Sequence, residues 1–336
     1  MPKPTTLWSP TQLAPPSRRS GKSGTVTASP TIARRTLLGA ALLLPLAGCA
    51  SHTTSAPSSD PIGGPGSVGV TPTVNDSDIR LAELERKFGA RLGVYALATG
   101  TGVTVAYRAD ERFAFCSTFK GLAAAAVLQR NPLSHLDTVV TYTEADLTKN
   151  ASITPRHVAT GMTIGQLCDA AIRYSDGTAG NLLLRDLGGP AELTAFVRGL
   201  GDTVTRMDRI EPLITEATPG DQRDTSSPRA LGSDYQKIVL GDALPDEKRA
   251  FLRDLLERNA TRAGARRIRA GIPQGWTVAD KTGTGDYGTL NDIAIVWPPG
   301  SAPLVVAIMS SKADRDAAYD EALLAEAAAS VVSALT

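Results

Sequence analysis

The run from Gly121 to Leu128 is the feature that most limits how this chain can fold. It holds four consecutive alanines between larger apolar residues and carries no charge, so a helix built from it is apolar on every side. Such a helix must be covered all round by other parts of the protein, and alanine is the strongest helix former. The sequence therefore predicts a buried helix, which Pro132 ends because proline cannot continue it.

Two polar residues lie at the start of this helix. Ser117 is expected at the N-terminus, where unpaired backbone N–H groups favour developing negative charge, and Lys120 follows three residues later on the same face. A serine becomes a nucleophile when a neighbouring base takes its proton, and a desolvated lysine can do so. However, Ser-x-x-Lys arises by chance about once in a chain of this size. A serine before a helix is commonly only an N-cap, so the pair alone decides nothing.

Charge and histidine spacing exclude several classes of function. The formal net charge is +1, but residues 1–48 hold six basic residues and no acid, so the remainder is mildly acidic. That balance, with few aromatic residues, argues against nucleic-acid binding. His52, His135 and His157 are far apart in the sequence and form no metal-ligand spacing. We therefore expect no metal, no cofactor and no Ser-His-Asp triad.

The first 75 residues are predicted to be an export signal and a tether. Arg34 and Arg35 precede a short apolar run, which indicates a signal peptide of the twin-arginine type over residues 1–49. Leu46-Ala47-Gly48-Cys49 resembles a lipobox, so Cys49 is the expected lipidation site, with an uncleaved anchor or a plain secretory signal as alternatives. Residues 50–75 are a Ser/Thr/Pro/Gly linker. The protein is thus expected to be exported, either anchored to the membrane by lipid alone or secreted.

The order of periodic segments predicts an α/β (α+β) domain over residues 76–336. A helix over 76–88 precedes two strands, 91–98 and 102–108, and residues 133–258 are predicted to be almost entirely helical. Three strands, at 276–281, 293–297 and 304–309, and a helix over 317–335 complete the chain. A helical subdomain (about 113–261) is therefore inserted into an α/β subdomain (about 76–112 and 262–336), with a cleft between them. Cys116 and Cys168 are expected to be buried thiols rather than a disulfide.

Three further motifs occur where an acyl-transfer site would need them. Ser175-Asp176-Gly177 breaks two helices, which can direct a hydroxyl into a cleft, although it is also an ordinary helix end. Lys281-Thr282-Gly283-Thr284-Gly285 ends a strand with a cation, hydroxyls and backbone N–H groups, a set suited to a carboxylate and an oxyanion. The loop 209–224 contains Glu211, and its end residues, Arg209 and Asp224, can pair to close it as an Ω-loop.

In this order the motifs resemble those of the class A serine β-lactamases. The resemblance is strongest to the actinobacterial members, which share the sequence of residues 115–120 and the Ser-Asp-Gly motif. The resemblance covers about residues 76–336. It implies an antiparallel sheet flanked by helices, an all-helical subdomain and an active site in the cleft between them. It also implies hydrolysis of penicillins and cephalosporins, with carbapenems as further candidates, and thereby antibiotic resistance. The implied partners are β-lactam antibiotics and β-lactamase inhibitors, and the enzyme is expected to be a monomer.

The same resemblance implies the roles of the site residues. Ser117 attacks the lactam carbonyl and becomes acylated, and the backbone N–H groups of Ser117 and Thr284 form the oxyanion hole. Either Lys120 or Glu211 through a water is the base for acylation. Glu211 then activates the water that releases the product. Ser175, held by Lys281, relays a proton to the lactam nitrogen.

Substrate binding is implied for a group of residues around the Lys-Thr-Gly motif, with some departures from the family pattern. Lys281, Thr282, Gly283 and Thr284 are expected to bind the substrate carboxylate. Gly177 replaces the usual asparagine, and Thr215 stands where Glu-x-x-x-Asn places the asparagine that helps Glu211 hold water. Leu290 replaces an arginine of many members, and Arg267 matches the position that some members use instead.

Two rival interpretations remain at this stage. Penicillin-binding transpeptidases and carboxypeptidases share the Ser-x-x-Lys and Lys-Thr-Gly elements but lack a counterpart of Glu211. A surface lipoprotein that senses β-lactams without turnover is the other alternative. The loop that contains Glu211 argues against both, whereas Thr215 keeps a non-hydrolysing protein open.

Overall fold

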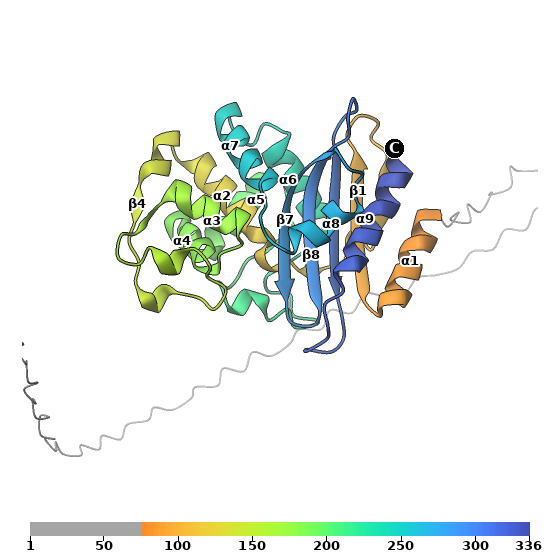
Figure 1. Cartoon of the computed structure of the whole chain (residues 1–336), viewed down its shortest axis with the longest axis horizontal. Helices are drawn as coiled ribbons and strands as arrows, with labels where there is room; N and C mark the ends of the chain where they lie inside the picture. The colour runs from red at the N-terminus through yellow and green to blue at the C-terminus, as the bar shows by residue number, and fades with distance from the viewer. Residues whose placement is uncertain (1–75) are drawn as a thin grey trace, which may run out of the picture. The chain divides into compact units, whose positions relative to one another are not determined.

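A five-stranded antiparallel sheet forms the centre of the computed structural model, which describes residues 76–336 (Figure 1). All the long strands predicted from the sequence join this sheet in the order β2-β1-β9-β8-β7, so the first two strands pair with the last three. The predicted antiparallel sheet is therefore confirmed. The strands are β1 Arg91–Ala98, β2 Thr104–Tyr107, β7 Thr277–Gly285, β8 Thr289–Trp297 and β9 Leu304–Ser311.

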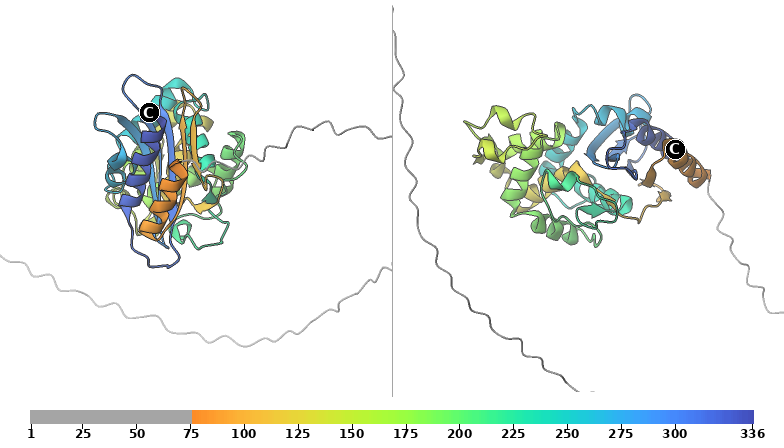
Figure 2. Two further views of the ribbon diagram at one scale, coloured as in Figure 1. Left: turned by 90° about the vertical axis from the view of Figure 1, so that its right-hand side faces the viewer. Right: turned by 90° about the horizontal axis from the view of Figure 1, so that it is seen from below.

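Both faces of this sheet are covered, which explains why its central strands are apolar without alternation. Side chains of a strand point to opposite faces in turn: in β9, Val305 and Ala307 enter one core, whereas Val306 and Ile308 enter the other. Helices α1 and α9 pack on one face, as Figure 2 shows, and α6 packs on the other. The bounds of the helices on the sheet are α1 Asp76–Phe88, α6 Pro228–Val239, α8 Ile268–Gly271 and α9 Glu321–Leu335.

The alanine-rich helix α2 is the centre of the helical part, and every residue from Phe119 to Leu128 is buried. Its small side chains let α3 to α7 approach it. At Gly121 an added Cβ would lie 2.3 Å from the hydroxyl oxygen of Tyr235 on α6, and this hydroxyl donates to the carbonyl of Thr118 at 2.7 Å. The glycine thus allows α6 to hold the start of α2. The helices are α2 Phe119–Arg130, α3 Ile164–Arg173, α4 Gly177–Leu187, α5 Pro190–Gly199 and α7 Asp246–Glu257.

The stretch 133–258 is less helical than its sequence indicated. The prediction of nearly continuous helix is wrong for 138–163 and 200–226, which form loops, short 3₁₀ turns and very short strands. Strands of two residues offer no alternation that a sequence pattern can reveal. The division into two subdomains stays a prediction. Helix α6 belongs to the predicted helical subdomain by sequence, but it packs on the sheet. The short pairs are β3 Phe113–Ala114 with β6 Thr225–Ser226, and β4 Val139–Val140 with β5 Met162–Thr163.

Several helix ends follow local signals in the sequence. Thr163 forms a capping box at the start of α3, and Ser227 caps α6 by accepting a hydrogen bond from the backbone N–H of Ala230. Gly188 ends α4 with φ at 108°, a left-handed conformation that favours glycine. The last helix begins at Glu321, four residues after the predicted start.

The two cysteines of the described domain, Cys116 and Cys168, are free and buried, as predicted. Burial raises the pKa of Cys168 to about 12, so this side chain is a thiol at neutral pH. The predicted signal, the lipobox with Cys49 and the linker fall outside the described residues. Within residues 76–336, no helix has the length and apolar character needed to cross a membrane.

Candidate active site

Ser117 lies in a tight turn that leads directly into α2. The turn is a 3₁₀ helix, Cys116–Thr118, and α2 begins at Phe119, so Ser117 precedes the α-helix rather than starting it. Cys116 adopts φ of 49°, an uncommon conformation for a residue with a side chain, and it turns the chain just before the serine. The side chain of Ser117 is almost fully enclosed by protein.

Lys120 reaches Ser117 from the first turn of α2, as its spacing predicted. Its Nζ lies 3.0 Å from Ser117 Oγ, 2.8 Å from the carbonyl oxygen of Ser175 and 2.7 Å from Glu211 Oε1. The side chain is fully buried and runs beside Gly180 of α4, where an added Cβ would lie 2.8 Å from Lys120 Cε. The glycine therefore leaves room for the buried lysine.

Glu211 brings a carboxylate to the same hydroxyl across 94 residues of sequence. Its Oε1 accepts a hydrogen bond from Ser117 Oγ at 3.0 Å in addition to that from Lys120. Burial opposes ionisation of this carboxyl, but the charge of Lys120, the hydrogen bonds from Lys120 and Ser117, and the influence of the Asn150 side chain outweigh it. The pKa of Glu211 is consequently below its ordinary value, and the side chain is an ionised, buried proton acceptor.

The loop that contains Glu211 is closed by the ion pair that the sequence predicted. Arg209 Nε lies 2.5 Å from Asp224 Oδ2, and the second carboxylate oxygen accepts from the backbone N–H groups of Asp208 and Arg209. Asp224 is 1% exposed, so removal of this carboxylate would leave three donors without their acceptor. The loop 209–224 is thereby held as one unit.

Ser175 and Lys281 form a second pair next to Lys120. Ser175 lies in the break between α3 and α4 with φ of 56°, and its Oγ accepts a hydrogen bond from Lys281 Nζ at 3.0 Å. Lys281 also donates to the carbonyl of Thr282 at 2.9 Å and is fully buried. Burial, and in second place the charge of Lys120, lower the pKa of Lys281 to about 7. A hydroxyl and a titratable amine are therefore paired here.

The end of β7 lies against the turn that carries Ser117. At Gly283 an added Cβ would lie 2.6 Å from the carbonyl oxygen of Phe115, so only glycine allows this approach. Asn291 of β8 donates to the same carbonyl at 3.1 Å and holds the turn from the neighbouring strand. The strand segment with Thr282 and Thr284 is thus next to Ser117.

Arg267 is almost completely buried behind β7. Its guanidinium donates to the carbonyls of Gly283 and Asn291 at 2.7 and 2.9 Å, and to the hydroxyl of Thr284 at 2.7 Å. These contacts show that Arg267 orients Thr284 and braces the two strands. Within the described residues, no cluster of His, Cys, Asp or Glu side chains is arranged to hold a metal ion.

Comparison with known proteins identifies the family. A model described as "Beta-lactamase enzyme family" matches residues 77–335. The chain belongs to the β-lactamase enzyme family.

Relatives and solved structures of β-lactamases match most of the chain. It is 54% identical over 309 residues to a β-lactamase of Mycobacterium tuberculosis, covering 90% of this chain and 97% of the relative. It is 51% identical over 307 residues to β-lactamase AST-1 of Nocardia asteroides, covering 90% and 96%. The structure of the β-lactamase from Streptomyces albus G, 49% identical, gives a TM-score of 0.76 over 78% of this chain and 100% of that chain.

A class A β-lactamase from Mycobacterium abscessus is 47% identical, with a TM-score of 0.74 over 77% of this chain and 98% of that chain. These similarities confirm the predicted fold, the serine β-lactamase class and β-lactam hydrolysis as its activity. They also confirm the resemblance to actinobacterial members.

Two side chains whose contacts the sequence analysis did not predict hold the site of this β-lactamase together. Asn181 of α4 clamps Glu211: its Oδ1 accepts from the backbone N–H of Glu211, and its Nδ2 donates to the carbonyl, both at 3.0 Å. Asp176 caps α4 and accepts from the backbone N–H groups of residues 152–154, which fastens that loop to Ser175. For Asn181 the available signal was a polar residue in the otherwise apolar helix α4, and for Asp176 it was the position of a capping residue just before this helix.

Thr215 and Gly177, the two departures from the family pattern near Glu211, differ in what they contact. The hydroxyl of Thr215 donates to the carbonyl of Pro212 at 2.7 Å, while Glu211 Oε2 is buried without a protein hydrogen-bond partner. An added Cβ at Gly177 would lie 3.2 Å from Glu211 Oε2 and 2.5 Å from the hydroxyl oxygen of Thr148. The backbone N–H of Gly177 donates to the carbonyl of Asn150 at 2.9 Å, which fixes the backbone of Asn150 against the start of α4.

Proposed function

We propose that Ser117 of this β-lactamase opens the lactam ring and that Glu211 takes its proton directly. The observation that supports this most is the 3.0 Å hydrogen bond from Ser117 Oγ to the ionised Glu211 carboxylate. Lys120 has three acceptors, Ser117 Oγ, the Ser175 carbonyl and Glu211, which match the three donors of an ammonium group. In this arrangement Lys120 stabilises the developing negative charge rather than acting as the base.

The second half of the reaction is hydrolysis of the acyl-enzyme. The proton that Glu211 took from Ser117 must then pass to Ser175, which has given its own proton to the lactam nitrogen, so that the Glu211 carboxylate is ionised again. Once Ser117 is esterified it no longer donates to Glu211, and the regenerated carboxylate can accept a proton from an incoming water. Asn181 supports this role because it fixes the backbone of Glu211 on both sides. The oxyanion hole formed by the N–H groups of Ser117 and Thr284 is part of the same proposal, and it is supported by the close approach of β7 to the serine turn.

Protonation of the departing nitrogen and capture of the substrate carboxylate are assigned to the Ser175–Lys281 pair and to β7. Lys281 donates to Ser175 Oγ, so Ser175 can pass its own proton to the lactam nitrogen and be stabilised by the amine. Thr282, Gly283 and Thr284 offer hydroxyl and backbone donors for the substrate carboxylate. Arg267 acts through Thr284, whose hydroxyl it holds.

Repeated turnover is the test of the whole proposal. With a chromogenic cephalosporin in at least thousandfold excess over purified enzyme, we expect complete hydrolysis, because Glu211 is placed to release Ser117 after each cycle. A single burst equal to the enzyme concentration would instead indicate a penicillin-sensing or penicillin-binding protein and would overturn the role given to Glu211.

The titration of Lys281 predicts a pH dependence of substrate capture. A lysine loses its charge above its pKa, which is lowered here to about 7, so kcat/KM for benzylpenicillin should fall as pH rises through about 7 to 8. The fall should approach about tenfold per pH unit. In the Michaelis complex the substrate carboxylate favours charged Lys281, so kcat should fall at higher pH than kcat/KM. Initial rates between pH 5.5 and 9.5 measure both profiles.

Two controls separate this effect from a general loss of activity. Lys281→Arg keeps its charge over the whole range and should remove the fall. The methyl ester of benzylpenicillin, which has no carboxylate, should show no fall with the unmodified enzyme. A kcat/KM for benzylpenicillin that stays constant up to pH 9 would contradict charged Lys281 as the carboxylate ligand.

Asn150 is proposed to supply the amide that Thr215 lacks. Its side chain contributes to lowering the pKa of Glu211, and its backbone carbonyl is held by the N–H of Gly177, which lies next to Glu211 Oε2. Asn150→Ala should therefore slow deacylation about tenfold, the effect of one lost hydrogen bond to a charged group. Because Thr215 occupies the position of the usual family asparagine, Thr215→Asn should restore deacylation in the Asn150→Ala background.

Deacylation is measured by chasing the acyl-enzyme with intact-mass spectrometry. Lys149→Ala, which changes the exposed neighbour of Asn150, is the matched control and should leave the rate within about twofold. If Asn150→Ala deacylates at the unmodified rate, or if Thr215→Asn fails to rescue it, Asn150 has no part in water activation.

Export and lipidation are proposed from the N-terminal sequence alone. Arg34 and Arg35 support the twin-arginine route, and Cys49 in its lipobox-like context supports a lipid anchor. Cys49→Ser should move the protein from the membrane fraction to the soluble fraction and abolish incorporation of radiolabelled palmitate. The folded domain is proposed to act as a monomer, and light scattering of purified residues 76–336 measures its mass.

A further inference from the structure

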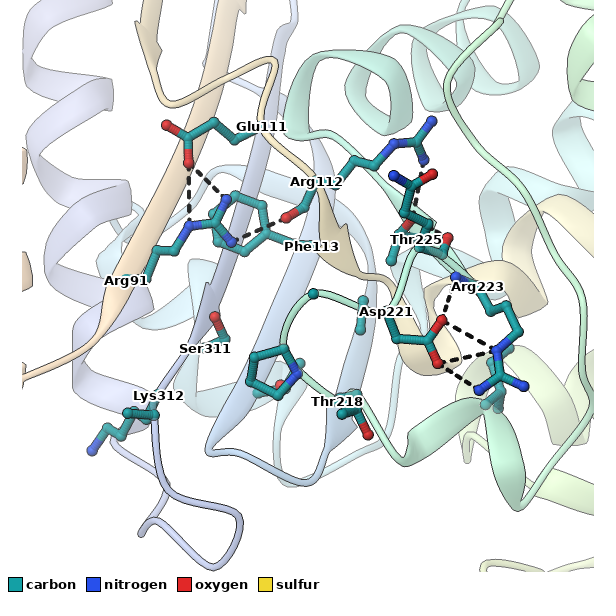
Figure 3. A pocket seen from close by; sticks show the side chains of 18 of the residues that line it. Arg91, Glu111, Arg112, Phe113, Thr218, Asp221, Arg223, Thr225, Ser311 and Lys312 are labelled. Carbon is teal, nitrogen blue, oxygen red and sulfur yellow. Dashed lines mark hydrogen bonds and ion pairs between the residues drawn. The ribbon is translucent and has the colours of Figure 1, made fainter.

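A pocket of about 750 Å³, separate from the site around Ser117, lies beside the loop 209–224 (Figure 3). It is lined by β3 and the residues before it, by residues 311–313 at and just after the end of β9, and by the segment 217–223 of the loop. Ser117, Lys120, Ser175 and Lys281 do not line it. Its volume falls within the range of small-molecule sites in proteins. The proposed chemistry leaves this pocket unexplained.

One of the five cations that line the pocket lacks an acidic partner. Arg91, Arg209, Arg223 and Lys312 each form an ion pair with a carboxylate. In the part of the chain that the structure describes, Arg112 has no carboxylate within ion-pair distance, and its side chain donates to Thr225 Oγ1 at 3.0 Å. Arg112 therefore has guanidinium donors available for a further anion.

A buried hydroxyl and an apolar wall complete the pocket. Thr289 is 1% exposed, lines the pocket, and its Oγ1 has no hydrogen-bond partner in the protein. A buried hydroxyl without a partner is unfavourable, and a polar ligand atom that reached it would satisfy it. Phe113, Ala217 and Pro219 supply apolar surface between these polar groups.

We propose that this pocket binds a small aromatic carboxylate that carries a second polar group. Its carboxylate pairs with Arg112, its ring packs on the apolar wall, and its polar substituent satisfies Thr289. This class of molecule matches one unpaired cation, one unpartnered hydroxyl and an apolar surface. A purely apolar ligand would leave the cation and the hydroxyl without partners, and a polyanionic ligand would find only one unpaired cation.

An occupant of this pocket contacts the loop that carries Glu211 without touching Ser117. Ile214 lines the pocket, and its backbone N–H donates to the carbonyl of Ile210, so this hydrogen bond spans Glu211. Binding should therefore change kcat without competing with substrate. This effect on turnover rests on the role proposed for Glu211, whereas the binding itself does not.

The test uses 6-hydroxy-2-naphthoate as the probe and 2-naphthoate, which lacks the hydroxyl, as the matched ligand. In ¹H–¹⁵N NMR titrations of the purified protein we expect shifts at the backbone amides of residues 112, 113, 217, 218 and 220–223. A ligand of this size should bind with a Kd on the order of 0.1–1 mM. The hydroxyl should strengthen binding severalfold in the unmodified protein and not in Thr289→Val, which preserves the shape of the side chain.

Arg112→Ala should weaken binding at least about tenfold, because it removes a charge-assisted contact. Arg223→Ala removes the same net charge from the pocket, but this arginine is already paired with Asp221, so binding should change by less than about threefold. Three outcomes would each overturn the proposal. The first is that shifts are confined to Ser117, Lys281 and Thr284, and the second is that no amide shifts up to about 10 mM probe. The third is that the two arginine variants weaken binding equally.

Discussion

Replacement of Glu211 with alanine is expected to leave the enzyme acylated. Without the carboxylate, no group of the described site is placed to activate water, and a positioned general base contributes about 10²- to 10⁴-fold. Acylation should continue, because Lys120 Nζ lies 3.0 Å from Ser117 Oγ and can take its proton when the Glu211 carboxylate is absent. Intact-mass spectrometry after mixing with benzylpenicillin should show the mass of one antibiotic added to the full population of enzyme.

A matched variant on the same loop distinguishes lost chemistry from a disturbed loop. Glu216 pairs with Arg209 at 2.6 Å, as Asp224 does, but its side chain is partly exposed and it does not approach Ser117. Glu216→Ala should therefore turn over at close to the unmodified rate. Rapid turnover by Glu211→Ala, with no adduct detected, would contradict the proposed deacylation step.

Replacement of Ser117 with alanine is expected to abolish hydrolysis. The hydroxyl is the atom that the proposed mechanism acylates, and removal of a catalytic serine costs about 10⁶-fold in a comparable acyl-transfer enzyme. Alanine keeps the backbone of the turn, so the fold should persist and substrate should still bind to β7. Steady-state assays with a chromogenic cephalosporin measure the rate, and calorimetric titration measures the retained binding.

Ser301→Ala, in the exposed turn between β8 and β9, is the control for this serine substitution and should behave as the unmodified enzyme. Circular dichroism of both variants should match. If Ser117→Ala still hydrolysed the antibiotic within about tenfold of the unmodified rate, the nucleophile would have to be another group, and the assignment of this site would be wrong.

Much of the site was predictable because each motif combines a local structure with its chemistry. Ser117 and Lys120 were placed together by the three-residue spacing of one helix, and the apolar run after them predicted the burial that both require. The loop closure by Arg209 and Asp224 followed from opposite charges at the two ends of a Gly- and Pro-containing segment. These are interactions between residues close in sequence, or within one loop.

Other parts of the site could not be read from the sequence. Asn181 and Asp176 look like ordinary helix residues until the fold brings the loop segments that they bind against them. The segments 138–163 and 200–226 were predicted as helix because pairing of two-residue strands leaves no periodic pattern. The substrate-binding role predicted for Arg267 stays a prediction; only the fold showed that its guanidinium also braces Gly283, Asn291 and Thr284.

The sequence by itself determined the buried central helix, the strands, the helix caps and the order of the reactive motifs, because those depend on side-chain period and on contacts within a few residues. Only the tertiary structure decided that Lys120 and Glu211 share Ser117 at hydrogen-bond distance, that Thr215 turns to Pro212, and that Arg112 and Thr289 face a separate pocket. These facts depend on how elements distant in the chain pack, and packing is set by the shapes and volumes of all of them together.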